Sequence, residues 1–317
     1  MKSLSLPSKR TTLGSACAAV ALLAAFWSNQ FISDSTGSRS SEDKRVTPEN
    51  YECKPHNYTT EIVSVDPLLI YINGFLRDEE ADLLVELGTP SLASSEIYIN
   101  NQKVASNTRT SRSAGLPPSS PLVSCILKRA LSFLGPALPS PSPSPNQNQI
   151  PNQNPLALFG TPQIVQYGPG EHFSTHHDWY DSPQVLRDGS MGEGRWWFNR
   201  WGSFFVYLDE GVEGGETWFP HVDVSSSPSS LGDYDGELGD GNGKWVRGLD
   251  EKGGKGGAGG TGGTKFLPRK GNALFWVNLH SNGTGDERVV HAGMEVRGGR
   301  KTAMNLWPRV YYGGGGR

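Results

Sequence analysis

The chain of 317 residues is predicted to fold mainly as β-structure, as a sandwich or barrel with flanking helices. Its second half contains several short segments rich in β-branched and aromatic residues, separated by turn-forming residues, which is typical of such folds. Only two segments further upstream show the apolar spacing that favours helices. The composition, 35% hydrophobic with 10% aromatic residues, is sufficient for a buried core.

Residues 1–45 are expected to be a targeting segment. Three basic residues precede a mostly apolar run over 13–27, and polar residues follow it. This length fits a signal peptide, and extension through Ile32 would make a short signal anchor, since spanning takes about 20 residues. Basic residues before the run would leave the rest of the chain on the lumenal side. We therefore expect an endoplasmic reticulum or secretory location, as a single-pass type II membrane protein or a lumenal protein.

Residues 46–66 are polar and are expected to be a linker, so that the folded domain covers 67–317. Two Asn-x-Thr triplets, at Asn57 and Asn282, are compatible with entry into the secretory pathway. The first elements predicted in the domain are, in order, a strand over 67–76, a helix over 78–87, strands over 97–99 and 108–113, and a helix over 121–134.

Two low-complexity insertions are expected in the domain. Residues at about 136–155 contain a Ser-Pro alternation and Asn/Gln repeats, and residues at about 223–266 are rich in Ser, Asp and Gly. Neither can bury much apolar surface. Strands are predicted between and after them, over 163–167, 173–179, 202–208, 215–219, 272–279 and 301–307.

Charge and cysteine content exclude some classes of protein. The net charge is −3, from 29 basic and 32 acidic residues, so neither nucleic acid nor an anionic membrane is an expected partner. The only membrane contact expected is through the N-terminal segment. Of the three cysteines, Cys17 lies in the apolar run, which leaves Cys53 and Cys125 as a pair or as two free thiols.

A candidate metal site lies at His176 and Asp178, two residues apart in a predicted strand. Side chains at i and i+2 leave a strand on the same face. His291, on a distant segment that could return past the first, is the best candidate for a third ligand. Two imidazoles and one carboxylate suit the non-haem Fe(II) enzymes that activate dioxygen. The same set also suits a hydrolytic zinc site.

Four motifs give the chain a recognisable resemblance. They are the pattern Tyr-x-x-Gly-x-x-Phe-x-x-His-x-Asp from Tyr167 to Asp178, the segments 199–220 and 270–279, and His291 followed ten residues later by Lys301. In this order the motifs resemble the prolyl 4-hydroxylase family, in particular its short, stand-alone members. The resemblance implies a double-stranded β-helix (jelly-roll) core, Fe(II), 2-oxoglutarate, dioxygen and L-ascorbate, with peptidyl proline as substrate.

The resemblance also implies roles for individual residues. His176, Asp178 and His291 match the iron ligands, which would leave three positions free for 2-oxoglutarate and dioxygen. Lys301 matches the lysine that binds the distal carboxylate of 2-oxoglutarate. Tyr167 and Thr217 match positions whose hydroxyls contact this cosubstrate. Strand alternation supports an interior Lys301, because it would share its face with Ala303, Asn305 and Trp307.

Three further residues resemble positions that line the peptide groove: Arg200, Trp307 and Phe173. Aromatic surface suits a polyproline-type chain, which has no spare backbone donors. The chain departs from the family at Phe173, where tyrosine is common, and at Ser203, where threonine is usual. These departures bear on peptide preference and remove none of the expected iron ligands.

The expected function is therefore hydroxylation of peptidyl proline at C4. One alternative keeps the iron and changes the substrate to a lysyl residue, a free amino acid or a small metabolite. Another is a non-catalytic binding module with a vestigial pocket. The sequence does not indicate the oligomeric state.

Overall fold

The computed structural model describes residues 45–95, 97–99, 102–104, 108–137, 155–187, 196–223, 244–247 and 262–312. The chain divides into two units, residues 1–46 and 47–317. Apart from Arg45, the predicted targeting segment lies outside the described residues, as do 138–154 and most of 224–261. Within the described ranges, no helix combines the length and apolar character needed to cross a membrane.

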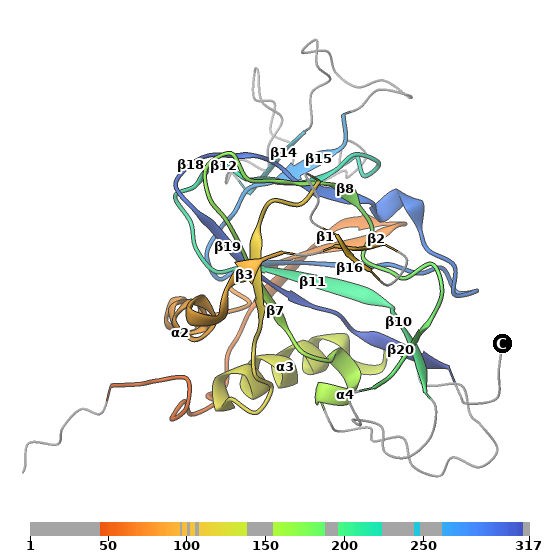
Figure 1. The fold of residues 1–317 in the computed structure, drawn as a ribbon. Helices are drawn as coiled ribbons and strands as arrows, with labels where there is room; N and C mark the ends of the chain where they lie inside the picture. Colours follow the sequence, from red (N-terminus) through yellow and green to blue (C-terminus); the bar gives the residue numbers. More distant parts are fainter. Residues whose placement is uncertain are drawn as a thin grey trace, which may run out of the picture. The chain divides into compact units, whose positions relative to one another are not determined.

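The largest element is an eight-stranded antiparallel sheet (Figure 1). Strands from both ends of the domain alternate in it, so that β2 pairs with β16 and β7 with β19. The order across the sheet is β1 (Thr59–Val65), β2 (Leu68–Asn73), β16 (Ala273–Val277), β11 (Gly202–Tyr207), β19 (Lys301–Leu306), β7 (Gln163–Tyr167), β6 (Arg112–Gly115) and β3 (Ala93–Ser94).

A second, five-stranded sheet packs on one face of the first. Its order is β14 (Trp245–Arg247), β15 (Thr264–Phe266), β13 (Thr217–Phe219), β17 (His291–Gly293) and β8 (Phe173–His176). Smaller sheets pair β20 (Arg309–Tyr312), β10 (Trp197–Arg200) and β9 (Gln184–Val185), then β12 (Glu213–Gly214) with β18 (Val296–Gly298), and β4 (Ile97–Ile99) with β5 (Gln102–Val104). This confirms the prediction of a mainly β, jelly-roll core.

Helices cover the other face of the large sheet (Figure 1). They are α2 (Asp78–Gly88), α3 (Pro121–Leu134) and α4 (Pro155–Phe159), with single 3-10 turns η1 (Thr89–Ser91), η2 (Gly135–Ala137) and η4 (Glu287–Val289). Strand β11 shows the result, because all its residues are buried. Phe204 and Val206 join the apolar cluster under the helices, while Phe205 and Tyr207 join the cluster between the sheets. Alternate residues of one strand therefore serve two different cores.

The two predicted helices are confirmed with small changes of their ends, as α2 and α3. The predicted linker over 46–66 is wrong in part, because β1 pairs with β2 and Tyr51 is buried under the helices. β1 is an edge strand in which only Val63 is buried. The predicted strand over 108–113 begins later, at Arg112. The predicted insertion at 223–266 contributes β14 and β15 to the second sheet.

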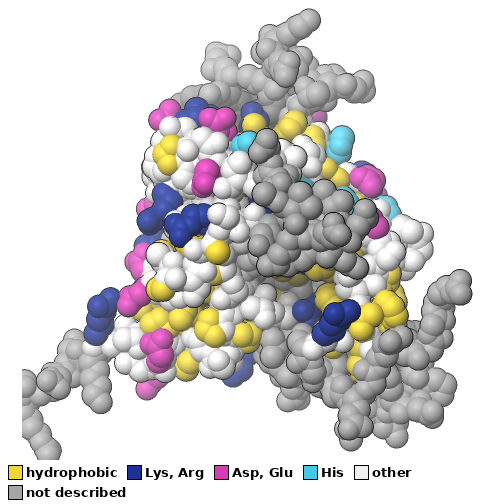
Figure 2. Space-filling model, viewed as in Figure 1, with side chains coloured by type: hydrophobic (Ala, Val, Ile, Leu, Met, Phe, Trp, Pro, Cys, Tyr) yellow, Lys and Arg dark blue, Asp and Glu magenta, His cyan; other side chains and the backbone are white. Residues whose placement is uncertain are grey.

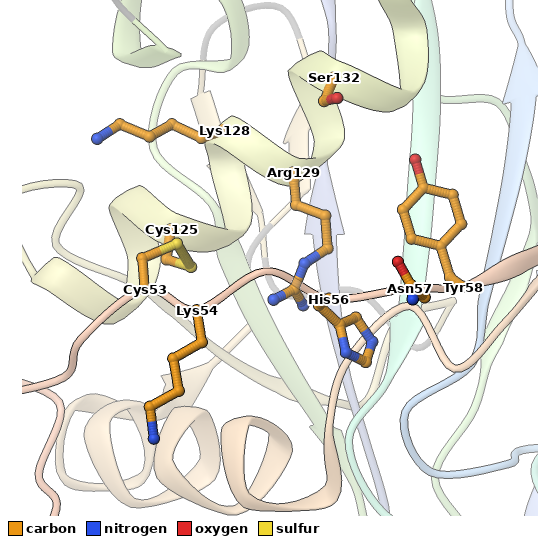
Figure 3. Close-up of a pocket in the computed structure, with 9 residues that line it drawn as sticks. All are labelled: Cys53, Lys54, His56, Asn57, Tyr58, Cys125, Lys128, Arg129 and Ser132. Carbon is orange, nitrogen blue, oxygen red and sulfur yellow. A yellow bond between two sulfur atoms is a disulfide. The ribbon is translucent and has the colours of Figure 1, made fainter.

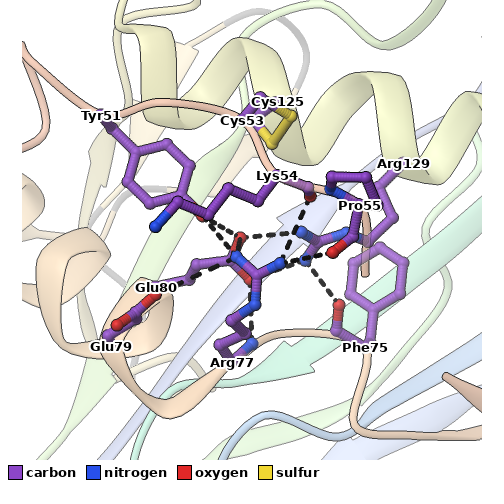
Figure 4. Close-up of a disulfide and its surroundings, with 10 residues drawn as sticks. All are labelled: Tyr51, Cys53, Lys54, Pro55, Phe75, Arg77, Glu79, Glu80, Cys125 and Arg129. Atoms are coloured by element: carbon purple, nitrogen blue, oxygen red, sulfur yellow. Dashed lines mark hydrogen bonds and ion pairs between the residues drawn. A yellow bond between two sulfur atoms is a disulfide. The ribbon is translucent and has the colours of Figure 1, made fainter. Parts of the chain in front are cut away.

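The N-terminal end of the domain is attached to α2 and α3 (Figure 4). Cys53 and Cys125 form a disulfide, which settles their pairing. Glu80 is fully buried and accepts two hydrogen bonds of 2.7 Å from the guanidinium of Arg129. Tyr51 also donates to Glu80, and Arg77 donates to main-chain oxygens of the same N-terminal segment. This buried ion pair and the disulfide fix the segment that precedes β1.

Basic and acidic side chains lie next to one another on the surface. On the face shown in Figure 2, Lys and Arg side chains lie beside Asp and Glu side chains along the left-hand side of the view. Ion pairs that the structure describes include Arg300 with Asp209 and Arg297 with Glu213. This distribution agrees with the nearly balanced composition of the chain.

Candidate active site

The two histidines of the predicted metal site meet because β8 and β17 pair in the five-stranded sheet. His176 and His291 are directly opposed partners in the antiparallel ladder, and their ring centroids are 4.3 Å apart. His291 is buried against the rings of Phe219 and Trp276. The sequence prediction that a distant segment returns past the first is therefore confirmed.

Asp178 reaches the same point from outside the strand. The prediction of one strand over 173–179 is wrong at its end, because β8 stops at His176 and Asp178 lies in the bend that follows. Its carboxylate is held by hydrogen bonds instead of by strand alternation. Ser203 Oγ donates to its Oδ2 over 2.6 Å and Trp307 Nε1 over 3.1 Å. Asp178 is 7% exposed, so these bonds lie in the interior.

The donor atoms fit a single divalent cation. One ligand atom from each of His176, Asp178 and His291 lies within 4.8 Å of the others. Each imidazole uses Nδ1 on a main-chain oxygen, His176 on Ser174 at 2.8 Å and His291 on Val289 at 3.1 Å. A carbonyl only accepts, so Nδ1 carries the proton and Nε2 is left with its lone pair. Both Nε2 atoms lie 4.0 Å from an oxygen of Asp178.

The protonation states suit a metal as well. Burial and the neighbouring His291 lower the pKa of His176 to about 3, and burial lowers the pKa of His291. Burial by itself would raise the pKa of Asp178, yet the two imidazoles, Arg200 and Ser203 lower it to about 2. At neutral pH the group therefore consists of two neutral imidazoles and one carboxylate. Three protein ligands leave coordination positions open for other molecules.

Lys301 is the second unusual feature of the site. It is 1% exposed and lies at the start of β19, opposite Tyr167 of β7. Its ammonium lies 3.4 Å from Thr217 Oγ1 and over the rings of Tyr167 and Phe205, at 5.4 and 5.0 Å. Among the described residues no carboxylate is within ion-pair distance of it. Burial lowers its pKa to about 7, against an attraction from Glu216 and Asp209.

Thr217 completes this part of the site. Its Oγ1 accepts a hydrogen bond of 2.9 Å from the hydroxyl of Tyr207, in addition to the contact with Lys301. Because both neighbours donate to this oxygen, the hydroxyl proton of Thr217 remains available to a ligand. Lys301 likewise keeps donors to spare. A buried cation beside a free hydroxyl donor fits the carboxylate of a small anion.

All nine predicted site residues line one cavity of about 390 Å³ between the two sheets. Arg200 and Trp307 lie against each other, with the guanidinium carbon 3.6 Å from the ring centroid, and Phe173 stacks on His176 at 3.5 Å. The cavity is lined by Arg109, Gln163, Tyr167, Phe173, His176, His177, Asp178, Trp179, Tyr180, Arg200, Phe205, Thr217, His291, Gly293, Lys301, Asn305 and Trp307. The predicted shared face of Lys301, Asn305 and Trp307 is thereby confirmed.

Sequence reasoning missed Arg109 and Gln163. Arg109 donates to Gln163 over 3.1 Å and lies over the ring of Phe173 at 4.8 Å. Burial lowers the pKa of Arg109. No motif surrounds Arg109, and it comes into the cavity through an isolated bridge with Phe173, a long-range pairing that the sequence does not reveal. The alternation of β7 could have placed Gln163 on the face of Tyr167.

A second cavity, of about 440 Å³, lies between the N-terminal segment and α3 (Figure 3). It is lined by Cys53, Lys54, His56, Asn57, Tyr58, Cys125, Lys128, Arg129 and Ser132. Its buried cation, Arg129, is already paired with Glu80 and with the main-chain oxygen of Phe75. The cavity between the sheets therefore remains the better candidate for chemistry.

Fold and site together define a class of protein: a jelly-roll in which one cavity holds a candidate three-residue metal site and a buried lysine without an ion-pair partner among the described residues. Comparison with known proteins shows what part of the chain resembles. Residues 162–309 match the family model of the 2OG-Fe(II) oxygenase superfamily. The match includes every predicted site residue.

Relatives of the chain are prolyl 4-hydroxylases. It is 28% identical over 258 residues to prolyl 4-hydroxylase 1 of Arabidopsis thaliana, across 80% of this chain and 72% of the relative. It is 26% identical over 256 residues to prolyl 4-hydroxylase subunit alpha-3 of Mus musculus, across 79% of this chain and 35% of that protein. A solved viral collagen prolyl hydroxylase from Paramecium Bursaria Chlorella virus-1 is similar at 20% identity and a TM-score of 0.43, covering 76% of this chain and 96% of that one.

Proposed function

We propose that this protein hydroxylates peptidyl proline at C4, with Fe(II) and 2-oxoglutarate. The observation that carries the proposal is the meeting of His176, Asp178 and His291 in the cavity that also buries Lys301. A metal ligand set alone would also suit zinc. The additional buried cation is what an anionic cosubstrate requires, and the match of residues 162–309 to the oxygenase superfamily favours iron.

One set of residues in the cavity would bind the metal, and another would bind the cosubstrate. His176, Asp178 and His291 would hold Fe(II) through Nε2, a carboxylate oxygen and Nε2. Lys301 would bind the distal carboxylate of 2-oxoglutarate, with Thr217 and Tyr167 as hydroxyl donors. Iron with 2-oxoglutarate and dioxygen supplies the oxidising power to hydroxylate an unactivated C–H bond, with succinate and carbon dioxide as the other products. The protein contributes binding, orientation and a cavity shielded from water.

The peptide would lie against Arg200, Trp307 and Phe173. All three are half-buried and line the cavity, and the ring of Trp307 and the guanidinium of Arg200 form one continuous surface. Such a surface suits the extended polyproline conformation. Trp307 and Arg200 also contact Asp178, through its Oδ2 and its main-chain oxygen, so the peptide surface and the metal ligand are mechanically connected.

Location and reductant belong to the same proposal. We place the enzyme in the endoplasmic reticulum or secretory pathway, held by its N-terminal segment or free in the lumen. The Cys53–Cys125 disulfide supports an oxidising compartment, where such bonds persist. L-Ascorbate is the proposed reductant that keeps iron in the ferrous state. Loss of sustained turnover when ascorbate is omitted would test that assignment.

The test is a peptide hydroxylation assay. The full chain is incubated with Fe(II), ascorbate, 2-oxoglutarate and a library of proline-rich peptides, and both succinate and peptide mass are measured. We expect succinate release coupled to one added oxygen on proline, and neither product from the Asp178→Ala variant. Succinate without oxygen on any proline would instead indicate a lysyl residue, a free amino acid or a small metabolite as substrate. Absence of metal-dependent succinate release would favour a non-catalytic binding module. Zinc bound to the purified protein would favour a hydrolytic site.

A further inference from the structure

The two oxygens of Asp178 have different environments. Oδ2 accepts hydrogen bonds from Ser203 Oγ at 2.6 Å and from Trp307 Nε1 at 3.1 Å. Oδ1 receives no donor from any residue that the structure describes, and it lies 4.0 Å from His176 Nε2, while Oδ2 lies 4.0 Å from His291 Nε2. The two hydrogen bonds to Oδ2 fix the plane of the carboxylate and leave Oδ1 without a competing donor.

The direction of the Ser203 hydroxyl is set by Asn278. Asn278 Nδ2 donates to Ser203 Oγ over 2.9 Å. Since a hydroxyl has one proton, and this oxygen already accepts from Asn278, the proton of Ser203 points to Asp178. The main-chain oxygen of Arg200 accepts from the same Nδ2 over 3.4 Å, which requires the nitrogen of the amide on that side.

The main chain of Asn278 also reaches the segment that carries His291. Asn278 accepts a hydrogen bond of 2.9 Å from the main-chain N–H of Asp286, at the start of the turn η4. Val289, in that turn, provides the carbonyl that binds His291 Nδ1. Asn278 is thus connected to Asp178 through Ser203 and to His291 through η4.

Stability alone does not account for this polar pair. Ser203 and Asn278 are both fully buried, at 0% exposure. Within the part of the chain that the structure describes, Asn278 Oδ1 has no hydrogen-bond partner. An unpaired buried oxygen costs free energy of folding, and an apolar side chain of similar volume would avoid the cost. The benefit of Asn278 is therefore expected in the site it orients.

We propose that Ser203 and Asn278 are positioning residues that orient Asp178 and thereby set the affinity of the site for its metal. The inference rests on the proposed function only in that His176, Asp178 and His291 bind a metal. Loss of a residue that hydrogen-bonds to a metal ligand commonly lowers metal affinity by about 10- to 100-fold. The effect should appear in binding of Mn(II), with no turnover involved.

The experiment measures Mn(II) binding by electron paramagnetic resonance and the melting temperature of the metal-free protein. Ser203→Ala should bind Mn(II) about tenfold more weakly than the wild type. Ser203→Thr keeps the hydroxyl and should stay within about threefold of the wild type. Asn278→Ala should weaken binding in the same direction, since it frees the Ser203 hydroxyl to rotate.

Ser120→Ala is the matched control. Ser120 is a buried serine that does not line the cavity between the sheets, and its hydroxyl donates to the main-chain oxygen of Pro48 over 3.1 Å. Its loss should lower stability without affecting Mn(II) binding. Wild-type affinity in Ser203→Ala, or an equal loss in Ser203→Thr, would overturn the proposal. If the melting temperature of metal-free Ser203→Ala lay well below that of Ser120→Ala, the Asn278→Ala variant would decide instead. Wild-type Mn(II) affinity in Asn278→Ala would then overturn the proposal.

The two proposals fail in different ways. Wild-type protein that binds Mn(II) but releases no succinate would contradict the proposed function. The positioning role of Ser203 would still be decided by Mn(II) binding, and an affinity about tenfold lower in Ser203→Ala would support it. Wild-type protein that binds no Mn(II) would end both.

Discussion

The two faces of the eight-stranded sheet bury charge in opposite ways. Under the helices, Arg129 and Glu80 are both buried and joined by two hydrogen bonds of 2.7 Å. On the other face, Lys301 is as deeply buried, but among the described residues its ammonium hydrogen-bonds only to a hydroxyl, that of Thr217, at 3.4 Å. A paired charge fixes structure, whereas an unpaired one costs stability until an anion arrives. The comparison separates a structural ion pair from a binding site.

The largest expected effect is the loss of turnover when a charged candidate metal ligand in the cavity is removed. Asp178→Ala, like His176→Ala, should reduce 2-oxoglutarate turnover to the level of metal-free protein, because two ligands do not hold the cation in place. Succinate release and metal content after dialysis measure this. Circular dichroism of the same samples serves as the folding control, and normal turnover by a well-folded Asp178→Ala protein would refute the metal assignment.

On the helix-covered face of the eight-stranded sheet, loss of a charged residue should lower stability instead of turnover. Glu80→Ala leaves the Arg129 guanidinium buried without its partner, which should cost about 3–5 kcal/mol of unfolding free energy. Denaturant unfolding measures the change, and turnover per folded molecule should be retained. The double variant Glu80→Leu with Arg129→Met should recover much of the loss. A cost below about 1 kcal/mol for Glu80→Ala would show that the pair is not the structural anchor described above.

Lys301→Met should give the opposite pattern to Glu80→Ala. Removing hydrogen bonds to a charged group should weaken 2-oxoglutarate binding by about 10- to 100-fold. Stability should stay the same or rise, because an unpaired buried charge is removed. Arg300→Met is the matched control, since it removes an exposed neighbouring charge of the same sign. A loss of stability comparable to that of Glu80→Ala would assign Lys301 to the structure instead.

The smallest expected effect is a pH dependence from the same lysine. Burial lowers the pKa of Lys301 from 10.5 to about 7. Between these values the unfolded chain binds more protons than the folded one, so the contribution of Lys301 to the free energy of unfolding rises with pH. Affinity for 2-oxoglutarate should fall over the same range, because the free protein loses its cation.

Isothermal titration of Mn(II)-loaded protein with 2-oxoglutarate, from about pH 6 to about pH 9, measures the second effect. The wild type should bind more weakly as the pH rises, while Lys301→Met should show little dependence. The same slope in both proteins would exclude Lys301 as its source.

Local pattern was enough to predict that His176 and Asp178 belong to one site and that Lys301, Asn305 and Trp307 share a face. The i, i+2 spacing located His176 and Asp178 correctly although the strand ends between them, since the hydrogen bonds from Ser203 and Trp307 replace strand geometry. Features that depend on pairing between distant segments could not be predicted. Arg109 enters the cavity through one isolated bridge, and the mostly exposed edge strand β1 resembles a linker until its partner is known.

Anaerobic titration of the Fe(II)-loaded protein with 2-oxoglutarate tests the central claim most directly, because the visible charge-transfer band of the complex requires metal and cosubstrate to occupy one cavity. The account predicts a saturable band in the wild type, a band that requires much more 2-oxoglutarate in Lys301→Met, and none in Asp178→Ala. Absence of the band from folded, iron-loaded wild-type protein would contradict it.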